Sequence, residues 1–221
     1  GQQVGIIDAD LQFGDMSVFF NATPKATILE ATRDINFLSP VTLNSYFSPV
    51  TENLRVLCGT SRPEYAEQVV IKGFTEVISM ARSMFRYILI DLSAGFNPIS
   101  VAAAELSDVT YLTAMIGGGF EIQHMQRALE IFKAWPDYEA RVKTIFTRVE
   151  PCDKEEQNKL SQALGYPVAA VIPNEYIRVS TAANNGQMAL RVQPDTKFAQ
   201  TVNRLADDII GEKTHIRWGN Q

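Results

Sequence analysis

Six short apolar runs rich in β-branched residues constrain the fold more than any other feature of the chain. They lack the alternation of a half-solvated sheet, so they are typical of strands covered on both faces. Stretches with helical periodicity separate them. Strands that alternate with helices predict an α/β fold, in which a doubly wound, mostly parallel sheet is flanked by helices. The strand runs are residues 4–8, 54–58, 87–91, 109–114, 142–148 and 168–172.

The helical patterns lie between these runs. We expect short helices and turns over residues 24–49, and the longer helices occupy residues 65–85, 99–106, 121–135, 154–164 and 196–210. In the third of the longer helices, Ile122, Met125 and Leu129 share one apolar stripe. Gly165 follows residues 154–164 directly, which is a common signal for the end of a helix.

The organisation expected from length and composition is one domain over residues 1–221. A chain of 221 residues with 46% hydrophobic residues can build a single α/β core. No Pro-rich or Gly/Ser-rich linker divides it.

Charge, cysteine content and hydropathy exclude several classes of protein. A net charge of -5 argues against a broad nucleic-acid surface, so no nucleic-acid partner is expected. Cys58 and Cys152 stand far apart, which indicates neither a disulfide framework nor a zinc or iron–sulfur site. No apolar stretch reaches membrane-spanning length, and Ile216 and Trp218 in the tail are too few for a stable membrane anchor. We therefore expect a cytoplasmic protein.

Acidic residues follow two of the predicted strands. Asp8 and Asp10 end the first strand, and Asp91 ends the third, with Gly95 four residues later. In open parallel sheets, ligands bind beside the carboxyl ends of strands. Such an acid typically holds magnesium, and the glycine lets a backbone N–H approach a terminal phosphate. A lone acid after a strand more often caps a turn or helix, but two acidic strand ends in one sheet favour a binding site.

Several motifs in order resemble the MinD/ParA group of P-loop ATPases, and within it the pilus-assembly branch called CpaE or TadZ. The stretch DLQFGD followed by VFFN points to that branch. The other motifs are YILIDLSAG, IFTRV and LGYPVAAVIPNEYIRVSTAANNGQ, and the resemblance runs from residue 4 to about residue 206.

The resemblance implies ATP and Mg²⁺ as cofactors and assigns roles on the phosphate side. Asp10 matches the aspartate that orients the attacking water, and Asp8 matches the acid that lies near the metal and the phosphate lysines. Asp91 matches the magnesium-binding acid, and Gly95 matches the glycine of the second switch loop.

The base side departs from the family pattern. Where the family has asparagine before arginine, this chain has Thr147 before Arg148. One hydroxyl cannot reproduce the bidentate pattern of an amide, so the sequence leaves the base selectivity open. Pro173 and Asn174 match a second adenine-side element, which could compensate.

The phosphate loop of the family has no counterpart in these residues. Nothing matches GxxxxGK[ST] or its deviant form, and the glycines at residues 117–119 lack the lysine and hydroxyl residue of such a loop. The first three residues resemble the turn that follows the family's first helix. We expect an N-terminally cut version of a longer protein, in which the missing central strand leaves unpaired strand edges.

The leading function is that of a cytoplasmic, ATP-dependent homodimer that places or assembles a Tad or type IV-like pilus or a secretion machine. Its partners would be proteins of that machine, at the inner face of the membrane or the cell pole. The alternative is a nucleotide-independent scaffold of the same fold. Thr147 and the missing phosphate loop favour the scaffold, whereas Asp10 and Asp91 favour the ATPase.

Overall fold

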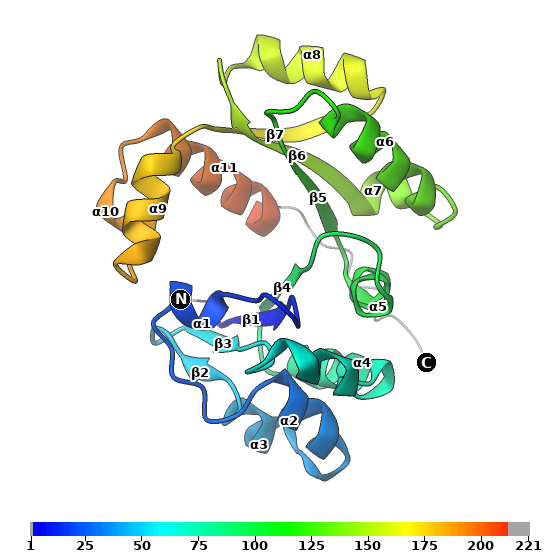
Figure 1. Cartoon of the computed structure of the whole chain (residues 1–221), viewed down its shortest axis with the longest axis vertical. Helices are drawn as coiled ribbons and strands as arrows, with labels where there is room; N and C mark the ends of the chain where they lie inside the picture. Colours follow the sequence, from blue (N-terminus) through cyan, green and yellow to red (C-terminus); the bar gives the residue numbers. More distant parts are fainter. Residues whose placement is uncertain (1, 212–221) are drawn as a thin grey trace. The chain divides into compact units, whose positions relative to one another are not determined.

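The computed structural model describes residues 2–211 and confirms the α/β fold. The chain divides into two compact units, residues 1–107 and 108–221 (Figure 1). Each unit has its own mostly or wholly parallel sheet with helices packed on it. The single-domain organisation stays a prediction.

The first unit contains a four-stranded sheet in the order β2-β3-β1-β4. Strand β1 (Val4–Ala9) lies between β3 (Leu54–Leu57) and β4 (Tyr87–Leu92) and is parallel to both. The short β2 (Ser48–Pro49) adds an antiparallel edge to β3. Because β1, β3 and β4 run the same way, their carboxyl ends meet at one edge of the sheet, and that edge carries the acids.

Helices and turns cover the two faces of this sheet differently. The main core packs Ile7 of β1 against α4 (Ile71–Ala81), with Phe74 and Val77 fully buried. The opposite face holds a small cluster around Ile6, which α1 (Met16–Phe19) helps to cover. The remaining elements of this unit are α2 (Ile28–Asp34), η1 (Ile35–Phe37), α3 (Pro40–Asn44), η2 (Pro63–Gln68) and α5 (Pro98–Leu106).

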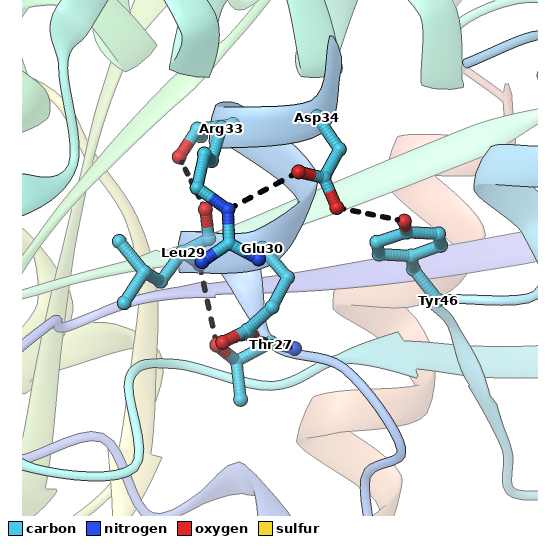
Figure 2. A network of polar contacts seen from close by, with 7 residues as sticks. Thr27, Leu29, Glu30, Arg33, Asp34 and Tyr46 are labelled. Carbon is cyan, nitrogen blue, oxygen red and sulfur yellow. Dashed lines mark hydrogen bonds and ion pairs between the residues drawn. The ribbon is translucent and has the colours of Figure 1, made fainter. Parts of the chain in front are cut away.

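Helix α2 begins with a capping box formed by Thr27 and Glu30 (Figure 2). The Thr27 N–H donates to Glu30 Oε2 at 2.7 Å, and the Thr27 hydroxyl accepts from the Leu29 N–H at 3.3 Å. Burial alone would raise the pKa of Glu30, but the hydrogen bonds from Thr27 lower it below its usual value. At the other end of the helix, the Tyr46 hydroxyl donates to Asp34 at 3.1 Å. The helix is thus tied down at both ends.

The second unit contains a three-stranded parallel sheet in the order β5-β6-β7. Its strands are β5 (Thr110–Met115), β6 (Val142–Val149) and β7 (Val168–Pro173). Its helices are α6 (Glu121–Phe132), α7 (Tyr138–Arg141), α8 (Lys154–Leu164), α9 (Tyr176–Asn184), α10 (Ala189–Val192) and α11 (Lys197–Gly211). Figure 1 shows α6 and α8 over one face of the sheet and α11 over the other.

The structure confirms all six predicted strands, but it confirms the predicted helix over residues 65–85 only in part, over α4. That stretch forms η2 and α4, separated at Val69 and Val70, whose backbones are extended. Val69 is buried in the core while Val70 is 64% exposed. Burying Val69 while the chain changes direction stabilises the break, and β-branched residues favour it because they are poor helix formers.

Four strands lie at sheet edges within the described residues, namely β2 and β4 in the first unit and β5 and β7 in the second. Strand β4 pairs only with β1, and β5 pairs only with β6. Parallel strands buried in α/β sheets normally have neighbours on both sides, and long exposed edges are uncommon.

No helix within residues 2–211 is long and apolar enough to cross a membrane. The tail that carries Ile216 and Trp218 lies outside the described residues.

We predict that Glu30→Ala lowers the free energy of unfolding by about 1–2 kcal/mol, because it removes the capping-box acceptor of α2. Urea unfolding measures the change. Glu67→Ala in η2 serves as the matched control, because Glu67 is an exposed glutamate and its loss should change stability by less than about 0.5 kcal/mol. Equal effects of the two substitutions would contradict the prediction.

Candidate functional site

The acidic residues predicted from the sequence gather at one edge of the first unit. Asp8 of β1 is the register partner of Asp91 of β4. Asp10 follows two residues after Asp8, and its charge raises the pKa of Asp91. The parallel register therefore places these three acids at the same edge of the sheet, as expected for the ends of adjacent parallel strands.

Asp8 is buried, and its carboxylate anchors the loop that follows β1. The side chain is 1% exposed. Oδ1 accepts from the Asp10 N–H at 3.2 Å, and Oδ2 accepts from the Met16 N–H at 3.3 Å. Burial raises the pKa of Asp8 to about 6, in part against these hydrogen bonds, which lower it. Asp8 thus holds the loop through hydrogen bonds to its backbone, and its carboxylate has little exposed surface for a ligand.

Two glycines make room for this buried carboxylate. A Cβ on Gly14 would lie within contact distance of both carboxylate oxygens of Asp8 and 2.6 Å from the Asp10 carbonyl oxygen. A Cβ on Gly59 would lie 3.3 Å from the Asp8 carboxyl carbon. Only glycine at residue 14 lets the loop close over Asp8, which gives a structural reason for the glycine in DLQFG.

Asp10 and Asp91 keep more of their carboxylate surface than Asp8. Asp10 is half-buried, and its Oδ1 accepts from the Phe13 N–H at 3.2 Å. Asp91 is exposed, and partial burial of its carboxylate together with the charge of Asp10 raises its pKa. These two acids face solvent at the sheet edge, so they can take part in binding.

Asp10 and Asp91 could bind Mg²⁺ only together with the phosphates of a nucleotide and with water. Within residues 2–211, no three histidine, cysteine or acidic side chains converge so as to hold a metal ion by themselves. Mg²⁺ in phosphoryl-transfer sites is held by one or two carboxylates, with phosphates and waters completing the shell. Asp91 and Asp10 suit that arrangement because a cation would relieve their mutual repulsion, whereas Asp8 is engaged by backbone N–H groups.

Gly95 lies in the loop between β4 and α5, with φ of 99° and an exposed backbone. Asn97 fixes the start of α5, since its side chain donates to Ser93 at 2.7 Å and accepts from the Ser100 N–H at 2.8 Å. The positive φ explains why glycine stands at residue 95. The loop after Asp91 therefore has a defined shape beside an exposed acid.

The predicted base-side residues lie in the second unit, at the carboxyl ends of β6 and β7. The register between these strands shifts from Phe146 opposite Val171 to Val149 opposite Pro173. Three steps along β6 thus match two along β7, which places Thr147 and Arg148 in a bulge. Pro173 ends β7, and Asn174 follows it, exposed.

Within the bulge, the two side chains behave differently. The Thr147 hydroxyl donates to the Ala114 carbonyl at 3.5 Å, so its one donor points to β5. Arg148 has φ of 58°, and its guanidinium lies 4.9 Å from the ring centroid of Tyr176. Sequence reasoning missed Tyr176. The sequence shows only that Tyr176 is an aromatic residue soon after Pro173, and it does not show that its ring contacts Arg148.

The glycine loop at residues 117–119 is closed by its own chain. The Gly117 N–H donates to Glu121 Oε1 at 2.6 Å, and the Gly118 N–H donates to the same oxygen. These hydrogen bonds, chiefly that from Gly118, lower the pKa of Glu121 to about 2. The carboxylate occupies the N–H groups that an anion would need.

Several solved structures have the same fold as this chain. A ParA family ATPase from Chlorobium tepidum superposes with a TM-score of 0.84 at 18% identity, over 93% of this chain and 85% of that one. MinD from Pyrococcus horikoshii, solved with Mg-ADP, gives 0.74 at 19% identity over 95% and 84%. The MinC:MinD complex of Aquifex aeolicus gives 0.73 at 17% identity over 96% and 85%. The chain therefore has a MinD/ParA-like P-loop fold.

The fold assignment rests on structural similarity alone. Neither the protein-family models nor the curated proteins match the chain.

We predict that Gly14→Ala displaces the loop of residues 10–16, because the new methyl group meets the Asp8 carboxylate. The free energy of unfolding should fall by about 1–3 kcal/mol, the usual effect of overpacking. Hydrogen exchange at the Met16 N–H should become faster. Gly117→Ala is the control, since a Cβ there meets nothing within 4 Å. Unchanged exchange at Met16 in Gly14→Ala would show that the loop does not depend on this contact.

We predict that Asp8 makes the unliganded protein less stable as pH rises. Its folded pKa of about 6 exceeds the ordinary value of 3.8, so its stabilising contribution is complete below pH 3.8 and lost as pH passes through 6. Between pH 4.5 and 7.5 the free energy of unfolding should fall by on the order of 2 kcal/mol relative to Asp8→Asn. Urea titrations of both proteins without metal or nucleotide measure the difference. Parallel pH profiles would contradict the assignment.

Proposed function

We propose that the protein is a cytoplasmic ATPase of the MinD/ParA type that switches by binding and hydrolysing Mg-ATP. The observation that carries the proposal is the cluster of two solvent-facing acids, Asp10 and Asp91, beside a loop that Asp8 holds in place. A fold of this type is also found in MinD solved with Mg-ADP. A protein that acted only by surface contacts would not need two mutually repelling acids at a ligand edge.

The proposed chemistry on the phosphate side uses the residues of the first unit. Water attacks the γ-phosphorus while the bond to the bridging oxygen breaks, which yields ADP and phosphate. Asp10 would orient that water, because its Oδ1 is fixed by the Phe13 N–H and its other oxygen remains available. Asp91 would bind Mg²⁺, which neutralises charge on the phosphates. Gly95, in its exposed loop, would donate its N–H to the terminal phosphate.

The residues matched to the base side lie in the second unit, and we propose them as a nucleoside-binding edge of that unit taken by itself. Arg148 and Asn174 are exposed at the carboxyl ends of β6 and β7, where ligands bind in such sheets. Thr147 and Pro173 lie beside them and shape the bulge.

The phosphate loop that this chemistry requires is not among the 221 residues. We propose that it belongs to a preceding segment of a longer protein, together with a strand. The edge of β4 supports this, because β4 pairs only with β1 in the described residues and could pair with a further parallel strand. The carboxyl-end acids of the first unit would then have a phosphate-binding partner.

Dimerisation in response to ATP is the proposed switch. The segment that Asp8 anchors presents exposed apolar side chains, with Phe13 75%, Val18 65% and Phe19 45% exposed. Exposed apolar groups of this size favour protein association. Because they lie on the loop after Asp10, ATP binding could alter their presentation. We propose that the resulting homodimer positions or assembles a Tad or type IV-like pilus or a secretion machine.

A nucleotide-independent scaffold is the second candidate, and Thr147 favours it because one hydroxyl cannot reproduce the bidentate pattern of an amide. Sedimentation of the intact protein with and without Mg-ATP separates the two candidates. A dimer that forms only with Mg-ATP supports the switch, and an identical mass in both conditions supports the scaffold.

For the ATPase, we predict that Asp10→Ala in the intact protein, with its phosphate loop, slows ATP turnover about 100-fold and changes the dissociation constant of ATP less than about threefold. The reason is that Asp10 acts on water and not on the nucleotide. Phosphate release and calorimetry measure the two quantities. Asp15→Ala is the matched control, because Asp15 is exposed in the same loop and its side chain caps nothing. Equal turnover in Asp10→Ala and Asp15→Ala would refute the role of Asp10.

A further inference from the structure

We propose that Thr60 is a positioning residue for ATP hydrolysis, because its hydroxyl ties the loop after β3 to the loop after β1 and so holds Asp10 in place. The inference rests on the proposed function, in which Asp10 orients the attacking water. It adds to that site a residue from a second loop, and every contact it uses lies within the first unit.

The loop after β3 approaches the loop after β1 just beyond the point where the two strands stop pairing. Their parallel ladder ends with Ile7 opposite Leu57. Beyond it, a Cβ on Gly59 would lie 3.3 Å from the Asp8 carboxyl carbon and 3.4 Å from the Asp10 carbonyl oxygen. The two backbones therefore pass each other with little room for a side chain at residue 59, and their contact continues outside the sheet.

The Thr60 side chain makes the hydrogen bond between the two loops. Its hydroxyl donates to the Leu11 carbonyl oxygen at 2.5 Å, and the Arg62 carbonyl oxygen, at 2.9 Å, is close enough to share the proton. Leu11 is buried, with its side chain in the main core. Removing the donor from a carbonyl oxygen in such a residue is unfavourable, so the hydroxyl of Thr60 stabilises the place of Leu11.

Asp10 is held from both sides by these contacts. On its amino side, its own N–H donates to Asp8 Oδ1 at 3.2 Å. On its carboxyl side, the adjoining residue Leu11 is held by Thr60. Between these two ties, Asp10 Oδ1 accepts from the Phe13 N–H at 3.2 Å, which sets the direction of the carboxylate. Loss of one tie should let the carboxylate shift, and a small shift of a catalytic group slows a reaction.

Thr60 can serve as a fixed point because the chain just before it is anchored independently of Asp10. The Cys58 carbonyl oxygen accepts from the Ile28 N–H at 2.9 Å, at the start of α2. Cys58 is itself buried and belongs to the small apolar cluster on one face of the sheet. The sheet and α2 thus set the position of Thr60, and the hydrogen bond to Leu11 transmits that position to the loop of Asp10.

ATP turnover by the intact protein, with its phosphate loop, tests the assignment in Thr60→Val, which keeps the branched shape of the side chain and removes the hydroxyl. We expect kcat to fall about tenfold and KM to change less than about twofold, because Asp10 shifts while the contacts to the nucleotide remain. Thr60→Ser, which retains a hydroxyl, should keep kcat within about twofold of wild type.

Thr75→Val is the matched control. The Thr75 hydroxyl also donates to a backbone carbonyl oxygen, that of Lys72 at 2.9 Å, but it lies within α4 and in neither loop. This variant should hydrolyse ATP as the wild type does, and urea unfolding checks that each variant is folded. Unchanged kcat in Thr60→Val, an equal loss in Thr60→Ser, or an equal loss in Thr75→Val would overturn the assignment.

Hydrogen exchange at the Phe13 N–H separates this inference from the proposed function, because that N–H reports the place of the Asp10 carboxylate and needs no nucleotide. In Thr60→Val it should exchange about fivefold faster, whereas exchange at the Phe74 N–H, bonded to Val70 in α4, should not change. Unchanged exchange at Phe13 rejects the hold on Asp10, whatever the turnover. If the intact wild type hydrolyses no ATP, the ATPase is rejected, and faster exchange at Phe13 in Thr60→Val retains the hold on Asp10 by itself.

Discussion

The burial of one carboxylate organises the functional edge of the first unit. Asp8 is ionisable yet almost fully buried, and an unpaired charge there would be strongly unfavourable. The backbone N–H groups of Asp10 and Met16 provide the compensation, so the loop between them must follow the carboxylate. Gly14 is a consequence of this constraint, since any larger residue would press on Asp8. Once the loop is fixed in this way, Asp10 stands at a defined place beside Asp91.

This arrangement gives different tasks to three acids of the same kind. Asp8 is a structural acceptor, whereas Asp10 and Asp91 keep carboxylate surface and repel each other. A repelling pair of carboxylates favours a bound cation, and such a cation could in turn bind a phosphate. In the segment after Asp10, Leu11 is buried in the core, whereas Phe13, Val18 and Phe19 stay exposed.

In the second unit, a bulge in β6 has the corresponding effect. The extra residue interrupts the ladder with β7 and turns Thr147 and Arg148 to different neighbours. Arg148 reaches an aromatic ring, while Thr147 turns back to β5. Residue 147 is a threonine where the resembled family has asparagine, and the guanidinium of the neighbouring Arg148 contacts the ring of Tyr176. The two side chains meet different neighbours because of the same local geometry.

The sequence by itself determined the α/β class, six of the seven strands and the candidate acids that follow two of them, but it missed the short β2. These follow from local properties, namely β-rich apolar runs and the chemistry of carboxylates. Only the tertiary structure decided which acid is buried, because Asp8 and Asp10 look alike in the sequence and differ only in what packs around them. The break at Val69 in the predicted helix, the bulge at Arg148 and the contact with Tyr176 likewise depend on burial and strand register. Those are properties of residues distant in sequence, and local patterns do not contain them.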